Sequence, residues 1–410
     1  MKSLCFLALL SIILCSPIFL NEKWTSDFLS IDGTNKLFYI LFKSRANLSK
    51  APLVFWLQGG PGCSGLKNAL TENGPFAINS DLTLTSSFYS WNNNADVVYI
   101  DQPLGTGFSS VKDISRIPST RKQLIEDFRN FLKAFLEKHT EYHGRDFYLA
   151  GHSYGTRFVL MYAKDLIDRK YDQLNLKGIA LGNGWYKPNT MLKSFTDFAE
   201  ENKLFINSFS YITTRLAYFF SSLFTNLRLH TLAHFFDQLG QIALNGINKR
   251  INLYDIRKEC NPKPSCYDAS KLIAFMNRSD VLHELKVDKK IWVQCSKNVY
   301  NQLVANEMYT DITNVLEELL NKIKVVIYNG KYDWRCNIKG IYATINQLKW
   351  NKKKEFDLSS WKPWIVTGRL AGKYKEAGKF KLYEVYDAGH LVTFDQPESS
   401  FDILTELLNE

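Results

Sequence analysis

A serine between two glycines is the residue in this sequence best placed to do chemistry. The residues Gly-His-Ser-Tyr-Gly at 151–155 follow a strand-like apolar run at 147–150 and precede a helical pattern at 158–167. An abrupt turn from strand to helix strains the backbone of the central residue, and flanking glycines avoid steric collision there. Such a turn lifts the Ser153 hydroxyl above a sheet edge, at a helix N-terminus that favours negative charge. The spacing therefore predicts a nucleophile for acyl groups.

This hydroxyl needs a base, and the base needs an orienting carboxylate. In α/β-hydrolases the chain order is serine, then acid, then histidine. Of the four histidines after Ser153, His390 comes just after a strand-like run at 382–386 and near the C-terminus. Asp333 lies in the exit loop of another apolar run, at 325–328. We therefore predict Asp333 as the acid and His390 as the base.

An acyl intermediate also requires two fixed backbone N–H donors for its oxyanion. One should come from Tyr154, and the other from the glycine-rich loop at 58–62, which alternatively forms only a tight turn. His230 and His234 are four residues apart on a helical pattern, but no third ligand accompanies them. The sequence predicts neither a metal nor an organic cofactor.

Short apolar runs of strand length position these residues. They occur at residues 38–42, 53–57, 96–100, 146–150, 176–181 and 325–328. Helical patterns separate them, as at 124–138, where apolar side chains recur on one face. Strands alternating with helices predict an α/β fold with a mostly parallel sheet covered on both faces.

Residues 185–290 interrupt this alternation. They are rich in Phe, Leu and Asn, with helical spacing through 211–247. We interpret them as an inserted helical subdomain that acts as a lid or only covers apolar surface. We expect a signal peptide at 1–20 and the first part of the core at 21–184. The insertion follows at 185–290, and the second part of the core at 291–410.

Composition excludes several classes of protein. The chain has 410 residues, of which 45% are apolar, 14% aromatic and 22% charged, so it is not disordered. Its 22 Gly and 11 Pro exclude a collagen-like or low-complexity chain. The net charge of +10 is spread along the chain, and the densest basic run, at 349–354, has no accompanying motif. We therefore predict no binding to nucleic acid.

The N-terminus predicts the compartment. Lys2 precedes an apolar stretch at 4–14, typical of a signal peptide and too short to span a bilayer comfortably, although an uncleaved anchor is the alternative. We expect the secretory pathway, ending in a lysosome, vacuole or the extracellular space, with no stable membrane association after cleavage. The sequons at Asn47 and Asn277 predict glycosylation.

Five of the seven cysteines follow the leader, which allows at most two disulfides and one free thiol. Cys260 and Cys266 are six positions apart and flank two prolines, which favours a small looped bridge.

These motifs together resemble the serine carboxypeptidase family, peptidases of the carboxypeptidase Y type, over nearly the whole mature chain. W-L-Q-G-G-P-G-C-S at 56–64 is similar to the family's W-L-N-G-G-P-G-C-S, and 101–109 resembles its D-Q-P-x-G-x-G-F-S. Further similar motifs lie at 72–76, 90–92, 182–184, 254–258, 333–337 and 388–390.

The resemblance implies an α/β-hydrolase fold with a mostly parallel central sheet and an inserted helical lid. It implies Ser153, Asp333 and His390 as the catalytic triad, and Gly60 and Tyr154 as oxyanion donors. It also implies disulfides and a free thiol, with the pairs Cys63–Cys295 and Cys260–Cys266 and the thiol at Cys336.

The chain departs from the family where the substrate's terminal carboxylate is recognised. Gln58 and His152 stand where the family has Asn and Glu, whereas the partner acid Glu72 is present. A cationic His152 would attract that carboxylate, so capture should weaken as the pH rises through about 6.5. The alternative is that His152 abolishes selectivity for free C-termini. The elbow also continues as G-T-R-F at 155–158, where A-G-H-Y is usual.

The expected function is that of a serine-type carboxypeptidase, which releases residues from peptide or protein C-termini through an acyl-enzyme. One alternative is an acyltransferase on the same scaffold, in which an alcohol intercepts the acyl-enzyme. The other is a non-catalytic binding or protective protein. The oligomeric state is not predicted.

Overall fold

The computed structural model describes residues 17–46, 48, 50–109, 111–246, 250–261, 266–287 and 291–409. Most of the predicted signal peptide, and Asn47, lie outside these residues. No helix within these ranges combines the length and the apolar character that a membrane span requires.

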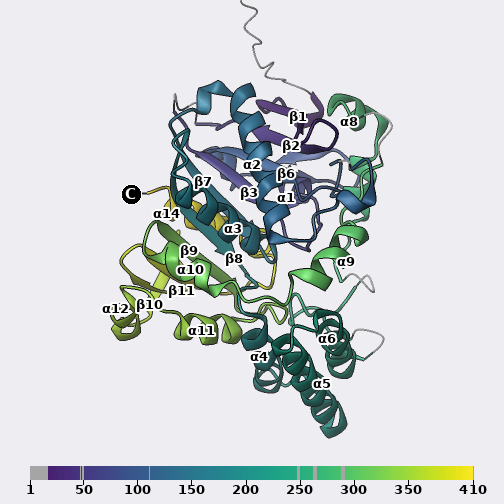
Figure 1. The fold of residues 1–410 in the computed structure, drawn as a ribbon, viewed down its shortest axis with the longest axis vertical. Helices are drawn as coiled ribbons and strands as arrows, with labels where there is room; N and C mark the ends of the chain where they lie inside the picture. Colours follow the sequence, from purple (N-terminus) through teal and green to yellow (C-terminus); the bar gives the residue numbers. More distant parts are fainter. Residues whose placement is uncertain are drawn as a thin grey trace, which may run out of the picture.

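A ten-stranded sheet runs through the molecule (Figure 1), in the order β1-β2-β6-β3-β7-β8-β9-β12-β11-β10. The six central strands from β6 to β12 are parallel, and antiparallel strands complete both edges. The strands, with a separate pair formed by β4 and β5, are β1 (Trp24–Ser30), β2 (Lys36–Phe42), β3 (Leu53–Leu57), β4 (Phe76–Ile78), β5 (Leu84–Ser86), β6 (Asp96–Asp101), β7 (Arg145–His152), β8 (Leu174–Gly182), β9 (Lys324–Gly330), β10 (Lys362–Val366), β11 (Arg369–Ala377) and β12 (Phe380–Val385).

Successive side chains of the central strands enter cores on opposite faces of the sheet. On β3, Leu53, Phe55 and Leu57 belong to one core, and Val54 and Trp56 belong to the other. Alternate side chains of a strand point to opposite faces, so a strand buried on both faces must be apolar throughout. The predicted α/β fold, with a mostly parallel sheet covered on both faces, is confirmed.

Helices cover both faces of the sheet. Helix α3 contacts β7 and β8 from one face, and α14 contacts β8 and β9 from the other. The helices are α1 (Leu66–Thr71), α2 (Arg121–Lys138), α3 (Gly155–Asp168), α4 (Pro188–Glu201), α5 (Ser208–Asn226), α6 (His230–Asn245), α7 (Ser270–Met276), α8 (Ser279–Glu284), α9 (Lys297–Asn306), α10 (Thr313–Leu320), α11 (Ile338–Gln347), α12 (Lys353–Leu358), α13 (Val392–Asp395) and α14 (Pro397–Leu408).

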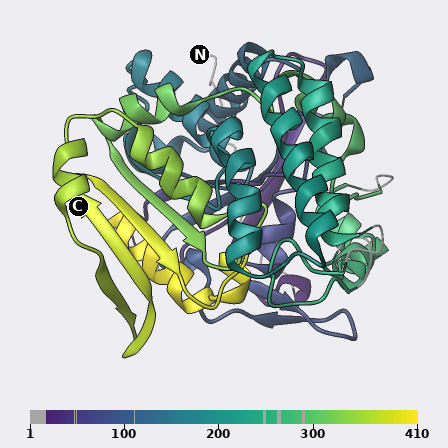
Figure 2. The same ribbon diagram turned by 90° about the horizontal axis from the view of Figure 1, so that it is seen from below.

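The residues interpreted as an insertion, 185–290, contain α4 to α8, between β8 and β9. Helices α4, α5 and α6 lie side by side at one end of the molecule (Figures 1 and 2). The division of the chain into a core and a lid remains a prediction.

Candidate active site

The predicted nucleophile lies at a sharp turn between β7 and α3. Ser153 has a φ of 57°, in the left-handed region that non-glycine residues rarely adopt. Its backbone N–H donates to the carbonyl of Gly182 at 2.9 Å, which ties the turn to β8. A Cβ on Gly155 would lie 2.0 Å from the Leu57 carbonyl oxygen, so only glycine allows this helix start to approach β3.

The structure brings Asp333 and His390 together from the ends of two parallel strands. Asp333 follows β9 and His390 follows β12. His390 Nδ1 donates to Asp333 Oδ2 at 2.7 Å, and both side chains are buried. Because a carboxylate only accepts, this bond fixes the proton on Nδ1 and leaves Nε2 for the proton of a nucleophile. Ser153 and His390 both line one cavity of about 500 Å³.

Two further donors hold the Asp333 carboxylate in place. Asn183 Nδ2 donates to the same oxygen as His390, at 2.9 Å, and the Cys336 N–H donates to Oδ1 at 3.2 Å. Asn183 also donates to the Gly389 carbonyl at 3.3 Å, beside the histidine. Asn183 therefore positions both the acid and the loop that carries the base.

The glycine-rich loop after β3 packs directly against the serine turn. A Cβ on Gly59 would lie 2.8 Å from both Ser153 Cβ and the Tyr154 backbone nitrogen. The next residue, Gly60, has a φ of 114° and lines the cavity together with Tyr154. Gly60 and Tyr154 therefore lie on two segments that pack together beside the nucleophile, and their role as oxyanion donors remains a prediction.

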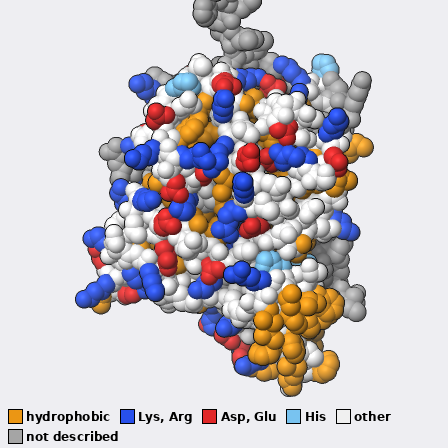
Figure 3. Space-filling view, in the orientation of Figure 1, with side chains coloured by type: hydrophobic (Ala, Val, Ile, Leu, Met, Phe, Trp, Pro, Cys, Tyr) orange, Lys and Arg blue, Asp and Glu red, His pale blue; other side chains and the backbone are white. Residues whose placement is uncertain are grey.

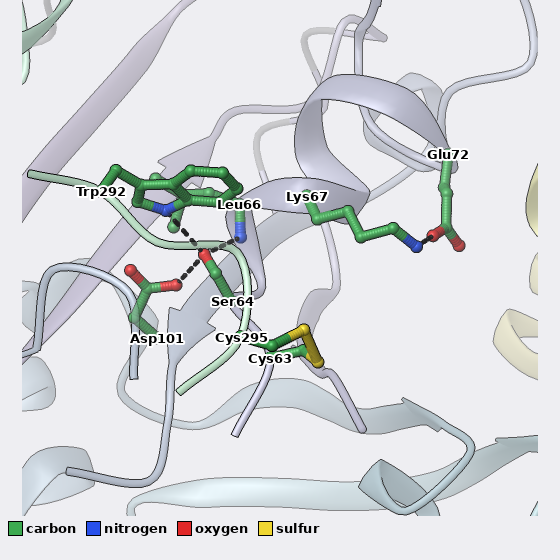
Figure 4. Close-up of a disulfide and its surroundings, with 8 residues drawn as sticks. All are labelled: Cys63, Ser64, Leu66, Lys67, Glu72, Asp101, Trp292 and Cys295. Atoms are coloured by element: carbon green, nitrogen blue, oxygen red, sulfur yellow. Dashed lines mark hydrogen bonds and ion pairs between the residues drawn. A yellow bond between two sulfur atoms is a disulfide. The ribbon is translucent and has the colours of Figure 1, made fainter. Parts of the chain in front are cut away.

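A disulfide and a buried serine anchor this loop (Figure 4). Cys63 is bridged to Cys295, and Ser64 Oγ accepts from Trp292 Nε1 at 3.1 Å. The same hydroxyl donates to Asp101. The structure also contains the bridge between Cys260 and Cys266, and Cys336 is buried and unpaired, in agreement with the pairing that the family resemblance implies.

A lysine that sequence reasoning missed lies at the expected carboxylate site. Lys67 Nζ donates to Glu72 Oε1 at 2.5 Å, and Thr393 Oγ1 donates to the other oxygen at 2.6 Å (Figure 4 shows the ion pair). Burial raises the pKa of Glu72, but Lys67, His152 and these hydrogen bonds outweigh it and hold the pKa below its ordinary value. Lys67 and Gln58 line the cavity, and the lining residues among those described do not include Glu72.

The expectation of a cationic His152 is wrong. Burial, followed by the proximity of His390, lowers the pKa of His152 to about 3, against the opposing charge of Glu72. His152 Nε2 lies 2.7 Å from the backbone carbonyl of His390, so Nε2–H donates and the proton sits on that nitrogen. The ring is therefore neutral and supports the loop of the catalytic base, and the cation at this end of the cavity is Lys67.

The departure from the family after the elbow has a structural explanation. Arg157 is buried, and its guanidinium donates to the carbonyls of Trp185, Glu307 and Thr310 at 3.3, 3.0 and 2.9 Å. These bonds tie α3 to segments on either side of the helices that follow β8. Arg157 thus connects the elbow helix to the wall of the cavity.

One group of metal-ligating side chains comes together in the described ranges, formed by Asp333, Cys336 and His390 within 4.8 Å of one another. The acid and the histidine already bind each other at 2.7 Å. Burial raises the pKa of the Cys336 thiol well above its ordinary value, so the sulfur is protonated. The group is the acid–base pair with a neutral thiol beside it.

Sequence reasoning also missed Asn183 and Arg335. Asn183 follows β8, and polar residues at the carboxyl ends of parallel strands point to a site, so its position was a usable signal. Arg335 lines the cavity, and its Nη1 has no hydrogen-bond partner among the described residues. Burial alone would lower the pKa of Arg335, but the charge of Asp237 and the nearby tyrosines outweigh burial and hold the pKa above its ordinary value. Nothing in the sequence indicated that this arginine faces the site.

Comparison with known proteins agrees with this geometry. The family model described as "Serine carboxypeptidase" matches residues 17–410. The chain is 34% identical to a serine carboxypeptidase-like protein of Oryza sativa subsp. japonica, over 90% of this chain and 88% of that protein. It is 31% identical to carboxypeptidase Y of Komagataella phaffii, over 94% of this chain and 76% of that protein.

Among solved structures, the chain is similar to Kex1(delta)p, a prohormone-processing carboxypeptidase from Saccharomyces cerevisiae. The TM-score is 0.86 and the identity 26%, over 96% of this chain and 92% of that chain.

Proposed function

The chain belongs to the serine carboxypeptidase family, a class of peptide hydrolases, and from this premise we propose that it releases the C-terminal residue of peptides through an acyl-enzyme on Ser153. The observation that carries the proposal is the hydrogen bond of 2.7 Å between His390 and Asp333, beside a strained serine in the same cavity.

In the proposed reaction, Ser153 Oγ attacks the carbonyl carbon of the last peptide bond, and His390 Nε2 takes the hydroxyl proton. The N–H groups of Gly60 and Tyr154 stabilise the oxyanion, and Asp333 stabilises the imidazolium that forms. The C–N bond breaks as His390 gives its proton to the leaving amine. Water then attacks the ester, with His390 again as base, and frees the shortened peptide and Ser153.

We propose that Lys67 selects substrates with a free C-terminus. An ammonium donates a charge-assisted hydrogen bond to a carboxylate, which a C-terminal amide cannot accept with the same strength. Glu72 accepts from Lys67 through one oxygen and from Thr393 through the other, so it fixes the position of the ammonium group. Gln58 lines the same cavity and is the proposed neutral donor to the carboxylate. His152 supports the loop of the base instead of binding substrate.

This arrangement predicts a Michaelis constant that does not depend on pH between 5 and 8. His152, with a pKa of about 3, is neutral throughout that range, and Glu72, with its pKa held below the ordinary value, is charged throughout. The substrate carboxylate is also ionised there. For a blocked dipeptide acid we expect KM to stay constant within about twofold. A KM that rises through about 6.5 would show that the histidine carries the charge.

Covalent labelling and substrate profiling test the proposed function. We expect a fluorophosphonate to label the wild-type enzyme at Ser153 and to leave Ser153→Ala unlabelled. Blocked peptides with a free C-terminus should be hydrolysed faster than their amides by about 10- to 100-fold in kcat/KM, as the loss of a charged hydrogen bond implies. Absence of labelling in folded protein would favour a non-catalytic role. Ester formation with an added alcohol in excess of hydrolysis would favour an acyltransferase.

We also propose that the protein enters the secretory pathway and acts in a lysosome, a vacuole or the extracellular space. Support comes from the disulfides Cys63–Cys295 and Cys260–Cys266, because disulfides form and persist in oxidising compartments. Glycosylation remains a proposal at both sequons. At Asn277 the amide nitrogen donates to the carbonyls of Ile273 and Trp292, so an attached sugar would replace at least one of these bonds.

A further inference from the structure

Helix α5 (Ser208–Asn226) is amphipathic with its apolar side turned outward. The residues that it buries include Ser210, Thr214 and Ser221. Its large apolar residues lie on the opposite side, where Phe209 is 75% and Phe219 63% exposed. A surface helix of a water-soluble protein shows the reverse pattern, with its apolar stripe against the core. The outward side of α5 is therefore suited to an apolar environment.

Helix α6 (His230–Asn245) has the same inversion. It buries Ala233 and Gly240 and exposes Phe235, Leu239 and Ile242. Ser221 Oγ of α5 donates to the Ala233 carbonyl at 2.7 Å, across the contact between the two helices. A Cβ on Gly240 would lie 2.6 Å from the Tyr218 ring, so glycine permits the close approach. Small and hydroxyl residues between helices, with large apolar residues outside, are typical of helices packed in lipid.

Together α5 and α6 form a hairpin that projects from the molecule (Figure 1), and apolar side chains cover the end that it forms in Figure 3. Asn189 of α4 donates to Asn226 at 2.9 Å, so the end of α5 near the turn is held against the body. We define the outer face by Phe209, Leu216, Phe219, Phe235, Leu239 and Ile242, each at least 38% exposed.

The charges of the hairpin suit an anionic surface. Its charged residues are Arg215, Arg228 and Asp237. Both arginines are exposed, whereas Asp237 is buried and accepts from Tyr309. Two acids interact with Arg215 through their charge. They are Asp197 and Glu200, and both lie on α4. Two exposed cations beside a broad apolar face match the composition of interfacial helices that bind anionic lipid.

A groove runs between the two helices on this face. Its volume is about 660 Å³, and its lining includes Ile206, Phe209, Phe220, Phe236 and Ile242. The lining is almost wholly apolar, so the groove is suited to an acyl chain and offers little to a polar ligand.

We propose that the outer face of the α5–α6 hairpin binds the surface of an anionic lipid bilayer and holds the enzyme there without spanning it. Interfacial helices of this kind bury their apolar face about 5–10 Å into the boundary between headgroups and acyl chains. The sequence predicts no stable membrane association once the leader is removed. That expectation rests on the absence of a span, and a hairpin that lies in the interface needs none.

Co-sedimentation with vesicles tests the proposal on the full mature chain. We expect the wild type to pellet with phosphatidylcholine vesicles that contain phosphatidylserine, and more weakly with phosphatidylcholine alone. The variant Phe209→Gln/Leu216→Gln/Phe219→Gln/Ile242→Gln should bind at least about 100-fold more weakly, because four apolar contacts with lipid are lost. Arg215→Gln and Arg228→Gln should each lower binding to the anionic vesicles by about fivefold.

A matched variant separates this face from exposed apolar residues in general. Phe88, Leu358 and Leu370 are 81%, 76% and 54% exposed elsewhere on the surface, and Phe88→Gln/Leu358→Gln/Leu370→Gln should bind vesicles like the wild type. All variants should hydrolyse soluble peptides at the wild-type rate, which reports their folding. An active wild type that stays in the supernatant with both vesicles would overturn the proposal.

A second copy of the chain is the other occupant that the experiment distinguishes. Sedimentation velocity without lipid gives the oligomeric state. A wild-type dimer that the four-residue variant converts to a monomer, with no vesicle binding by either, would assign the face to self-association and contradict the lipid proposal.

Discussion

Replacing Asp333 with Asn is expected to lower kcat by about four orders of magnitude, with KM changing much less. The carboxylate accepts from His390 Nδ1 at 2.7 Å and from Asn183 Nδ2 at 2.9 Å through one oxygen. An amide in its place would present an N–H to one of these donors or favour the imidazole tautomer with its proton on Nε2. That nitrogen could then no longer accept the proton of Ser153. The substitution also removes the charge that stabilises the imidazolium.

The measurement compares kcat and KM for a blocked dipeptide acid, together with the rate of fluorophosphonate labelling. The matched control is Asp311→Asn. Asp311 also lies between Ser153 and His390 in the chain, but its side chain is 49% exposed and caps a turn at Thr313. We expect the control to retain activity within about twofold, in line with the small effects of surface substitutions. A loss below tenfold for a folded Asp333→Asn enzyme would show that another group orients the base.

Asn183→Ala gives an intermediate case within the same prediction. It removes one hydrogen bond from the acid and one from the Gly389 carbonyl, while the bond between His390 and Asp333 can still form. We expect a smaller loss of kcat than for Asp333→Asn, because the charge and the tautomer are retained. A larger loss would mean that the loop carrying His390 depends on the amide more than on the carboxylate.

The sheet and the pairing of Asp333 with His390 could be predicted because each depends on a local pattern. Runs such as 53–57 are apolar at every position, and only a strand buried on both faces requires that. Parallel strands end at the same edge of a sheet. Residues that follow such runs are therefore expected at one edge, where Ser153 and His390 line one cavity and Asp333 accepts from His390. The long separation between them in the sequence does not weaken this argument.

The properties that the sequence could not predict depend on contacts between distant segments. The low pKa of His152 arises from its burial and from His390, 238 positions away. Lys67 stands in an ordinary helical pattern, and only the fold places it in the cavity of Ser153. The spacing at 211–247 correctly indicates helical structure, which is divided between α5 and α6. The spacing does not say whether the large apolar side chains face the protein, and in α5 they face outward.

Replacing Lys67 with Met should remove most of the preference for a free C-terminus. We expect kcat/KM for a blocked dipeptide acid to fall by about 10- to 100-fold, as the loss of a hydrogen bond to a charged group implies, while hydrolysis of the dipeptide amide changes by less than about twofold. Both substrates share the same scissile carbonyl, so a defect in the triad would lower both rates together. The ratio of the two rates therefore isolates the contribution of the ammonium.

The single substitution also leaves the Glu72 carboxylate without its partner. Glu72 is 6% exposed, and an unpaired buried charge costs about 3–5 kcal/mol of stability. The double variant Lys67→Met/Glu72→Gln removes that charge, and we expect it to recover most of the thermal stability without recovering selectivity. Arg335→Met removes a second cation that lines the cavity, and an unchanged acid-to-amide ratio is the expected result if Lys67 alone binds the terminal carboxylate. Equal losses on acid and amide in the stable double variant would contradict the role of Lys67. They would mean that this ion pair supports the wall of the cavity and that the terminal carboxylate is bound elsewhere.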